Sequence, residues 1–183
     1  MLNKFRKDIE RYKAYSGKNS LVLLFTQQGL WALCVYRINN SIYSSSLPGI
    51  FKKILLFFGL LWQKWIEIIC GISIPYSARI GEGFYIGHFG NIIINSDVEI
   101  GRNCNISQGV TIGVSGRGEK RGVPSIGDHV YMGANAVIAG KIKVGDNSVI
   151  AANSLVVSDV DPGCTYLGVP AVKINNNNSE AYI

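Results

Sequence analysis

The sequence predicts a mainly β fold, a parallel β-helix of about four coils that follows an α-helical N-terminal segment. Aliphatic residues recur every six positions from residue 80 onward, whereas helical spacings of three and four dominate before residue 70. The glycines follow the same division, because only four of the 21 lie before residue 71. We therefore divide the chain into a helical segment of residues 1–70, a β-helix of residues 71–174, and a tail of residues 175–183 that we expect to be flexible.

The helical segment should contain three helices. Phe5, Ile9 and Tyr12 recur at spacings of three and four with basic residues between them, which indicates a first helix. Residues 20–38 and 49–69 predict two more, separated by a Ser-, Pro- and Gly-rich break at residues 44–49. The charge-free run 54–63 is too short to cross a bilayer, which takes about 20 residues. We expect an interfacial or core helix there.

Charge is concentrated in the same segment. Residues 1–70 hold ten Lys and Arg against three acidic residues, within a chain whose net charge is +6. Because these charges alternate with long apolar stretches, we expect peripheral contact with an anionic membrane surface rather than with nucleic acid. A solvated helix face is the alternative.

The β-helix prediction follows from the register of the repeats. Each repeat is a short strand and a turn whose aliphatic residue points inward, and three repeats close one coil. Stacked coils bury an aliphatic column that no single coil could bury. The inward positions are Ile80, Ile86, Ile94, Ile100, Ile106, Ile112, Ile126, Met132, Ile138, Val144, Ile150 and Val156.

The register breaks twice. Eight residues separate Ile86 from Ile94, which predicts an insertion of two around Gly90 and Asn91. Fourteen separate Ile112 from Ile126, and residues 113–124 lack inward aliphatics, so we expect an exposed loop rich in Gly and Arg. Loops on a rigid scaffold commonly carry binding and catalytic residues.

Composition excludes several classes of protein and site. An apolar fraction of 48% and a charged fraction of 16% exclude a disordered or collagen-like chain. Four cysteines without close spacing predict reduced thiols in a cytoplasmic protein. Two histidines exclude a three-histidine metal centre within one subunit, so we expect no metal. His129 lies in a regular repeat at a position that points outward, so we expect no functional role for it.

Six stretches carry a resemblance to a known family: SIPYSARIG at 73–81, IGHFGN at 86–91, GVTIG at 109–113, MGANA at 132–136, IAANS at 150–154 and GVPA at 168–171. Residues 71–175 resemble the serine acetyltransferase branch of the left-handed β-helix acyltransferases. The short helical segment is most similar to that of capsule, colanic-acid and O-antigen O-acetyltransferases. The resemblance implies left-handed coils, acetyl-CoA as donor, and a homotrimer, with a dimer of trimers as the larger alternative.

The resemblance also implies site residues. His88 matches the family's general base, which takes the proton of an attacking hydroxyl, and imidazole suits this task near neutral pH. The resemblance assigns acetyl-CoA binding to Gly113, Ser115, Gly133, Ala134, Ala152 and, near the C-terminus, Lys173. The alternative is that the small residues among them serve only the turns of the coil. Loop cations that could meet phosphates or an acidic sugar, or simply be solvated, are Arg117, Lys120 and Arg121. Residues expected to shape the acceptor pocket, with packing as the alternative, are Tyr85, Phe89 and Asn91.

Three departures from the family pattern direct the prediction of the acceptor. Ser73 replaces an orienting acid, Gly87 replaces an acid that contacts the serine amino group, and Val123 replaces a second histidine. We therefore expect a neutral sugar hydroxyl, on a lipid-linked precursor of a bacterial surface polysaccharide at the inner face of the cell membrane. The alternatives are serine O-acetylation in cysteine biosynthesis and a non-catalytic scaffold subunit. Ser73, Glu82 and a backbone carbonyl all remain candidates to orient His88.

Overall fold

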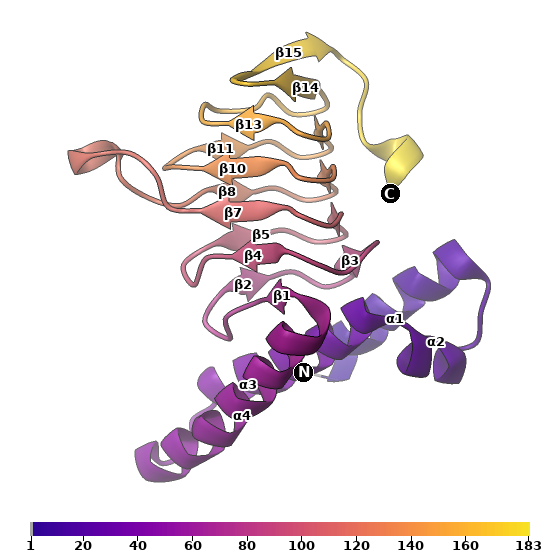
Figure 1. The fold of residues 1–183 in the computed structure, drawn as a ribbon, viewed down its shortest axis with the longest axis vertical. Helices are drawn as coiled ribbons and strands as arrows, with labels where there is room; N and C mark the ends of the chain where they lie inside the picture. Colours follow the sequence, from indigo (N-terminus) through magenta and orange to yellow (C-terminus); the bar gives the residue numbers. More distant parts are fainter. Residues whose placement is uncertain (1) are drawn as a thin grey trace.

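The computed structural model describes residues 2–183, which form four α-helices followed by a three-sided column of short strands (Figure 1). The helices lie against the N-terminal end of the column. Their bounds are Leu2–Ser16 for α1, Ser20–Thr26 for α2, Gln28–Tyr43 for α3 and Gly49–Cys70 for α4.

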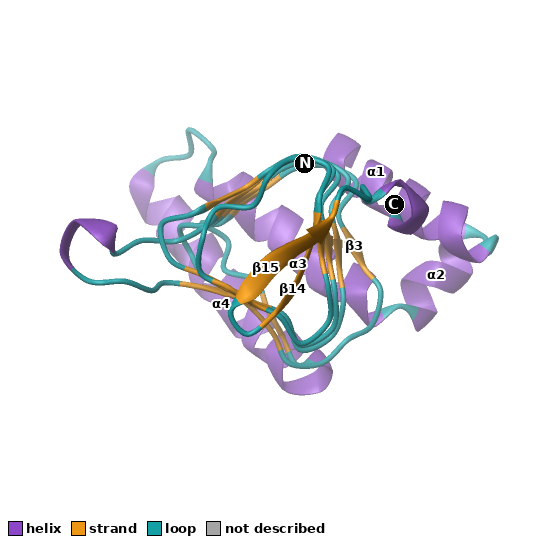
Figure 2. Ribbon diagram, turned by 90° about the horizontal axis from the view of Figure 1, so that it is seen from above, coloured by secondary structure: helices purple, strands orange, loops and turns teal. Residues whose placement is uncertain are grey.

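The strands form three sheets, which we name faces A, B and C; Figure 2 shows them from above as the sides of a triangle. Face A consists of β1 (Ile72–Ser73), β4 (Ile92–Ile94), β7 (Thr111–Gly113), β10 (Val137–Ala139) and β13 (Leu155–Val156). Face B consists of β2 (Arg79–Ile80), β5 (Glu99–Ile100), β8 (Ser125–Ile126) and β11 (Lys143–Val144). Face C consists of β3 (Tyr85–Ile86), β6 (Asn105–Ile106), β9 (Tyr131–Met132), β12 (Val149–Ile150), β14 (Thr165–Gly168) and β15 (Ala171–Asn175).

The coils stack in register and bury the predicted aliphatic column. Ile80 pairs with Ile100, and Ile100 with Ile126, along face B. Every pairing in the column is parallel except that of β15, which turns back on β14. The prediction of a left-handed parallel β-helix behind an α-helical segment is confirmed. The column extends beyond the expected four coils, because β1 begins at Ile72 and face A holds five strands.

The corners of the triangle explain why Asn and Gly recur. At the corner before face C, Asn103, His129 and Asn147 have positive φ angles of 54°, 56° and 58°. Asn is the non-glycine residue that best tolerates this left-handed conformation. His129 takes a place in this turn ladder, where its Nε2 lies 3.2 Å from Nδ2 of Asn103.

The prediction of a single helix over residues 20–38 is wrong. Gln27 is extended (φ −109°, ψ 105°) and separates α2 from α3, which meet at a bend of 92°. The Gln27 amide still donates to the carbonyl of Leu23 (2.9 Å). The bend allows Leu23 and Leu30, on either side of it, to be fully buried.

A buried ion pair joins the helices to the column. Arg37 of α3 donates through Nε and Nη2 to both carboxylate oxygens of Asp8 of α1, at 2.8 and 3.0 Å. Its Nη1 reaches the carbonyl of Ile80 at 2.7 Å, and Asp8 accepts the amide of Phe84 at 2.9 Å. Burial raises the pKa of the Asp8 carboxyl, although the Arg37 guanidinium opposes this shift. Both side chains thus connect two helices with the first coil.

Helix α4 packs on the rest of the protein along one side only. Its buried residues are Gly59, Ile66 and Cys70, and Gly59 accepts a hydrogen bond from Nδ2 of Asn39 in α3 (2.9 Å). The prediction of a core or interfacial helix fits this half-covered position. By length and composition, no single helix within residues 2–183 qualifies to cross a bilayer, whereas α2 and α3 pass that test only as a bent pair.

Residues 175–183, expected to be a flexible tail, pack against the column. The Tyr182 ring stacks on Tyr131 of β9, with centroids 4.5 Å apart. The Ser179 amide donates to the carbonyl of Asn147 (3.0 Å), and the Tyr15 hydroxyl of α1 donates to the carbonyl of Tyr182 (2.6 Å). Aromatic stacking and these hydrogen bonds hold the tail on face C.

Candidate active site

His88 lies in the turn between β3 and β4, at the corner where face C passes into face A. Hydrogen bonds between coils show which residues are extra in this turn. The Gly90 carbonyl accepts the Gly109 amide (2.9 Å), just as the Gln108 carbonyl one coil later accepts the Asn135 amide (2.9 Å). Gly90 and Gln108 are therefore equivalent positions.

The residues before these positions are equivalent as well. The Gly87 amide donates to Ile106 and the Ser107 amide to Met132, each at 3.0 Å. Ser107 leads directly to Gln108, whereas Gly87 is followed by His88 and Phe89 before Gly90. These two residues are the insertion, which the sequence placed slightly later in the turn.

The insertion lifts both side chains out of the coil. His88 is exposed, and 52% of the Phe89 surface is accessible. Within residues 2–183, no hydrogen bond engages the His88 ring. The imidazole is therefore available to a molecule bound at this corner.

Small residues continue along the same corner above His88. Successive coils place Gly90, Gln108, Ala134 and Ala152 in one line, since the Asn153 amide donates to the Ala134 carbonyl (2.8 Å) as the Asn135 amide does to Gln108. We call this line the corner column. Its steps are about 4.8 Å, the spacing of paired strands.

Gly133 stands beside this column where a side chain would not fit. A Cβ atom at Gly133 would lie 2.6 Å from the amide nitrogen of Ala152. The structure thus brings three of the predicted cofactor-binding positions, Gly133, Ala134 and Ala152, into line with His88.

Gln108 was not predicted from the sequence. Its Oε1 is buried and has no hydrogen-bond partner among the described residues. A buried acceptor without a partner costs about 1–3 kcal/mol, so a ligand donor at this position would relieve a real penalty. The signal lay in the repeat itself, because Gln108 occupies the coil position that Ala134 and Ala152 fill in later coils.

A carboxylate reaches the neighbourhood of Ser73 from α4. The Ser73 hydroxyl donates to Oε1 of Glu67 (2.9 Å), and β1 places Ser73 opposite Ile93 of β4, the strand that follows the His88 turn. Burial alone would raise the pKa of Glu67, but hydrogen bonds from Lys64, Gln63 and Ser73 hold it below its ordinary value. The ionised Glu67 carboxylate therefore lies beside Ser73, a position where the sequence itself provides only a hydroxyl.

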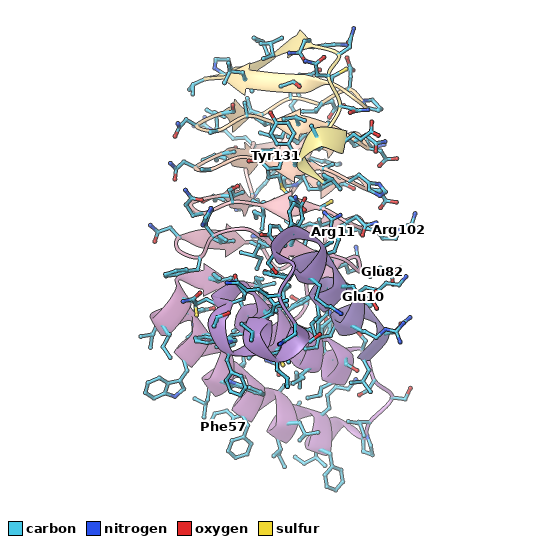
Figure 3. All side chains as sticks on the ribbon, turned by 90° about the vertical axis from the view of Figure 1, so that its right-hand side faces the viewer. Glu10, Arg11, Phe57, Glu82, Arg102 and Tyr131 are labelled. Atoms are coloured by element: carbon cyan, nitrogen blue, oxygen red, sulfur yellow. The ribbon has the colours of Figure 1, made fainter. Side chains whose placement is uncertain are left out.

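Glu82, another candidate to orient His88, lies at the opposite corner of face C, in the turn before β3. It forms an ion pair with Lys7 of α1, and this partner lowers the pKa of the Glu82 carboxyl. Figure 3 shows Glu82 beside the N-terminal helices, with Glu10, Arg11 and Arg102 near it. Within residues 2–183, no group of three or more His, Cys, Asp or Glu side chains is arranged to hold a metal ion.

The three residues expected to shape the acceptor pocket have different surroundings in the structure. Tyr85 stacks on Tyr15 and packs on Tyr12 of α1, with centroids 4.4 and 4.5 Å apart, which is its packing alternative. Phe89 is exposed beside His88. Asn91 holds a positive φ of 54° in the same turn, where it serves the backbone geometry.

The loop after β7 leaves the column as expected and includes a short 3₁₀ helix, η1 (Gly118–Lys120) (Figure 2). Paired backbone hydrogen bonds of 3.1 and 3.0 Å between Ser115 and Gly122 close its base. A groove of about 500 Å³ lies at this base and is lined by Ser115, Lys120 and Ala139 among others. Gly113 and Ser115 therefore lie at the far edge of face A from His88.

Lys173 lies near the C-terminal end of the column on β15, 3.3 Å from a carboxylate oxygen of Asp161. Face C places β15 five strand spacings from β3, or about 24 Å. A groove of about 800 Å³ runs between Ala152 and the docked tail, including Asn176 and Tyr182. A ligand that contacts both His88 and Lys173 must be long and extended.

Comparison with known proteins identifies the family. A model of the bacterial transferase hexapeptide (six repeats) matches residues 124–158. A serine acetyltransferase of Helicobacter pylori is 32% identical over 162 residues, which cover 88% of this chain and 90% of that protein. The chain belongs to the serine acetyltransferase family. The predicted hexapeptide-repeat acetyltransferase class is thereby confirmed.

Other serine acetyltransferases extend the match. That of Synechococcus elongatus is 32% identical over 166 residues, 91% of this chain but only 64% of that longer protein. The Brucella abortus structure in complex with coenzyme A superposes with a TM-score of 0.84 at 27% identity, covering 96% of this chain and 68% of its own. The family fold thus includes the helical segment as well as the coils.

These relatives overturn the expected acceptor. Proteins that match nearly the whole chain are named serine acetyltransferases, so the predicted sugar acceptor and the placement among capsule and O-antigen enzymes are wrong. The prediction rested on missing acids at Ser73 and Gly87 and on a missing histidine at Val123. It could not include Glu67, which the fold brings to Ser73 from a different element.

Proposed function

We propose that this protein is a serine O-acetyltransferase that uses acetyl-CoA as donor and His88 as general base. The observation that carries the proposal is the two-residue insertion that frees the His88 ring at the foot of the corner column. The names of the relatives support the acceptor, and the coenzyme A complex of the Brucella abortus relative supports the donor.

The corner column suits an extended thioester. Ala134 and Ala152 offer small side chains, so a pantetheine arm can lie close to the backbone of successive coils. Lys173, about 24 Å along the column from the His88 coil, would then meet the nucleotide phosphates. In this arrangement the acetyl group faces His88.

The reaction needs one proton acceptor. The serine hydroxyl oxygen attacks the thioester carbonyl carbon, and His88 takes the hydroxyl proton as the C–O bond forms. Collapse of the tetrahedral intermediate breaks the C–S bond, and the proton passes from His88 to the departing thiolate. The products are O-acetylserine and free coenzyme A.

Glu67 and Gln108, neither of which was predicted from the sequence, would supply the polar contacts that a serine acceptor requires. The Glu67 carboxylate, held ionised beside Ser73, would pair with the serine ammonium in place of an acid at Gly87 or Ser73. The unpartnered Oε1 of Gln108, one coil above the His88 turn, would accept a further hydrogen bond from the bound ligands. A homotrimer would complete the site, since one chain presents it as an open corner.

The proposal is tested by release of free thiol from acetyl-CoA with L-serine as acceptor, using the full chain. His88→Ala should lower turnover by about 100- to 10,000-fold, the usual contribution of a general base. His129→Asn is the matched control, because asparagine holds the equivalent turn positions at 103 and 147 and the activity should be retained. No thiol release from the wild type with serine would refute the proposal and favour a scaffold.

A further inference from the structure

The outer side of α4 is a large apolar surface that no segment within residues 2–183 covers. We define the α4 outer face as its twelve large apolar side chains with 41–76% of their surface exposed: Ile50, Phe51, Ile54, Leu55, Phe57, Phe58, Leu60, Leu61, Trp62, Trp65, Ile68 and Ile69. Soluble monomers rarely expose contiguous apolar patches beyond a few hundred Å². Such a surface indicates a partner.

The direction of this face limits what can cover it. Along the other side of the helix, Gly59, Ile66 and Cys70 are buried, and Asn39 of α3 is hydrogen-bonded to Gly59. Figure 3 shows Phe57 projecting from the end of the molecule that is opposite the coils. The surface therefore lies on the side of α4 away from α3, and its whole length of about 33 Å is presented side-on.

The charges on α4 favour an anionic partner. The helix carries Lys52, Lys53 and Lys64 but a single acid, Glu67, which is already hydrogen-bonded to Lys64, Gln63 and Ser73. Lys52 donates to the carbonyls of Tyr43 and Ser45 and Lys64 pairs with Glu67, so Lys53 is the exposed cation without a partner among the described residues. A second copy of the same face offers it no free carboxylate. Anionic lipid headgroups supply the missing charge.

The residue types match a membrane interface as well. Trp62 and Trp65 combine an apolar body with a polar N–H, which places tryptophan at the boundary between headgroups and acyl chains. Lysine side chains can extend their ammonium groups from an apolar helix surface to the headgroups. Apolar aromatic residues with flanking lysines are typical of helices that lie in the plane of the interface.

We propose that the α4 outer face docks on an anionic lipid surface, with α4 parallel to the membrane plane and the β-helix directed away from it. The apolar side chains enter the boundary between headgroups and acyl chains, and Lys53 contacts the headgroups. This inference concerns lipid binding by side chains other than those proposed for catalysis, so it holds or fails independently of the acceptor.

Flotation of the full-length protein tests it, with vesicles of phosphatidylcholine alone or mixed with phosphatidylglycerol. The wild type should float with the mixed vesicles, with weaker flotation at high salt because salt screens the headgroup charge. Trp62 and Trp65 emission should shift to the blue and become protected from an aqueous quencher. The background for this measurement is Trp31→Phe, which removes the remaining tryptophan.

Two sets of variants locate the contact. Phe58→Gln/Trp65→Gln changes exposed side chains and should abolish flotation without unfolding the protein. Val172→Gln/Ile174→Gln, an equally exposed apolar pair on β15, is the matched control and should float normally. Lys53→Gln should weaken partitioning about fivefold, as expected for a lysine at an anionic surface.

The competing occupant is a second copy of this chain, which sedimentation without lipid measures. If the wild type does not float and its mass falls in Phe58→Gln/Trp65→Gln, the face is an interface between copies and the proposal is overturned. Flotation that persists in Phe58→Gln/Trp65→Gln would overturn it equally, because the contact would then lie elsewhere.

Discussion

At the scale of single residues, Glu67 gives the sharpest test of how the acceptor is bound. Glu67→Gln keeps a side chain that can accept the Ser73 hydrogen bond but removes the negative charge. Loss of a hydrogen bond to a charged group costs about 1.5–3 kcal/mol, so the KM for serine should rise by about 10- to 150-fold. The KM for acetyl-CoA should stay unchanged.

Glu10→Gln is the control for the Glu67 measurement, because Glu10 is an exposed acid that pairs with Arg6 in α1. An unchanged serine KM in Glu67→Gln would exclude the proposed ammonium contact. The pH dependence has a defined sign. Since the pKa of Glu67 is held below its ordinary value of 4.5, the carboxylate stays ionised when the pH falls from about 7 to about 5. Protonation of Glu67 therefore should not raise the serine KM in that range.

Gln108 provides a second test with an unusual signature. In Gln108→Ala, the free protein loses a buried oxygen that has no partner, so the midpoint of thermal unfolding should stay equal or rise. Binding should weaken about 2- to 12-fold, the equivalent of one lost hydrogen bond. Unfolding curves and Kd for coenzyme A, with KM for serine, separate these effects. A lowered midpoint with unchanged binding would assign Gln108 a structural role.

At the scale of elements, the crossing of α3 and α4 depends on Gly59. A Cβ atom there would collide with the side-chain amide of Asn39, whose nitrogen donates to the Gly59 carbonyl. Gly59→Ala should therefore lower the free energy of unfolding by about 1–3 kcal/mol, measured by urea denaturation. Gly49→Ala, at the open start of the same helix, should be neutral or stabilising by up to about 1 kcal/mol. Equal effects at the two positions would contradict this account.

The elements also show how far sequence reasoning extends. The period of six fixes inward positions from Ile80 to Val156, because each coil repeats the same contacts. The break at Gln27 could not be predicted, because the apolar periodicity continues through it. The bend depends on the packing of Leu23 and Leu30. The insertion at His88 was detected by counting, but its exact residues required hydrogen bonds between coils.

The candidate site was predictable to the same degree. His88, Ala134 and Ala152 belong to a local motif and to the repeat, so their common corner follows from the sequence. Glu67 and the docked Tyr182 do not, because each meets its partners only through tertiary packing of a separate segment. The absence of acids at Ser73 and Gly87 therefore misdirected the acceptor prediction.

At the scale of the whole molecule, the Asp8–Arg37 pair decides whether the helices stay docked on the column. Both side chains are buried, with 0 and 2% exposure. Asp8→Ala leaves the Arg37 charge without its partner, which should cost about 3–5 kcal/mol of unfolding free energy in urea denaturation. The double variant Asp8→Leu/Arg37→Met should be less damaging than Asp8→Ala alone. The opposite order would mean that the pair itself supplies the stability.

Because the coils stack at a constant spacing, the number of coils sets the distance between the two ends of the column. The reactive corner lies on the first coils and Lys173 lies near the last, so the distance between them can change only in whole steps of about 4.8 Å. Insertion or deletion of one complete coil above Gln108 would keep the contacts between neighbouring coils and still shift the register between the two ends. The number of coils therefore sets the length of ligand that this fold accepts. Point substitutions along the corner change only the width of the binding surface.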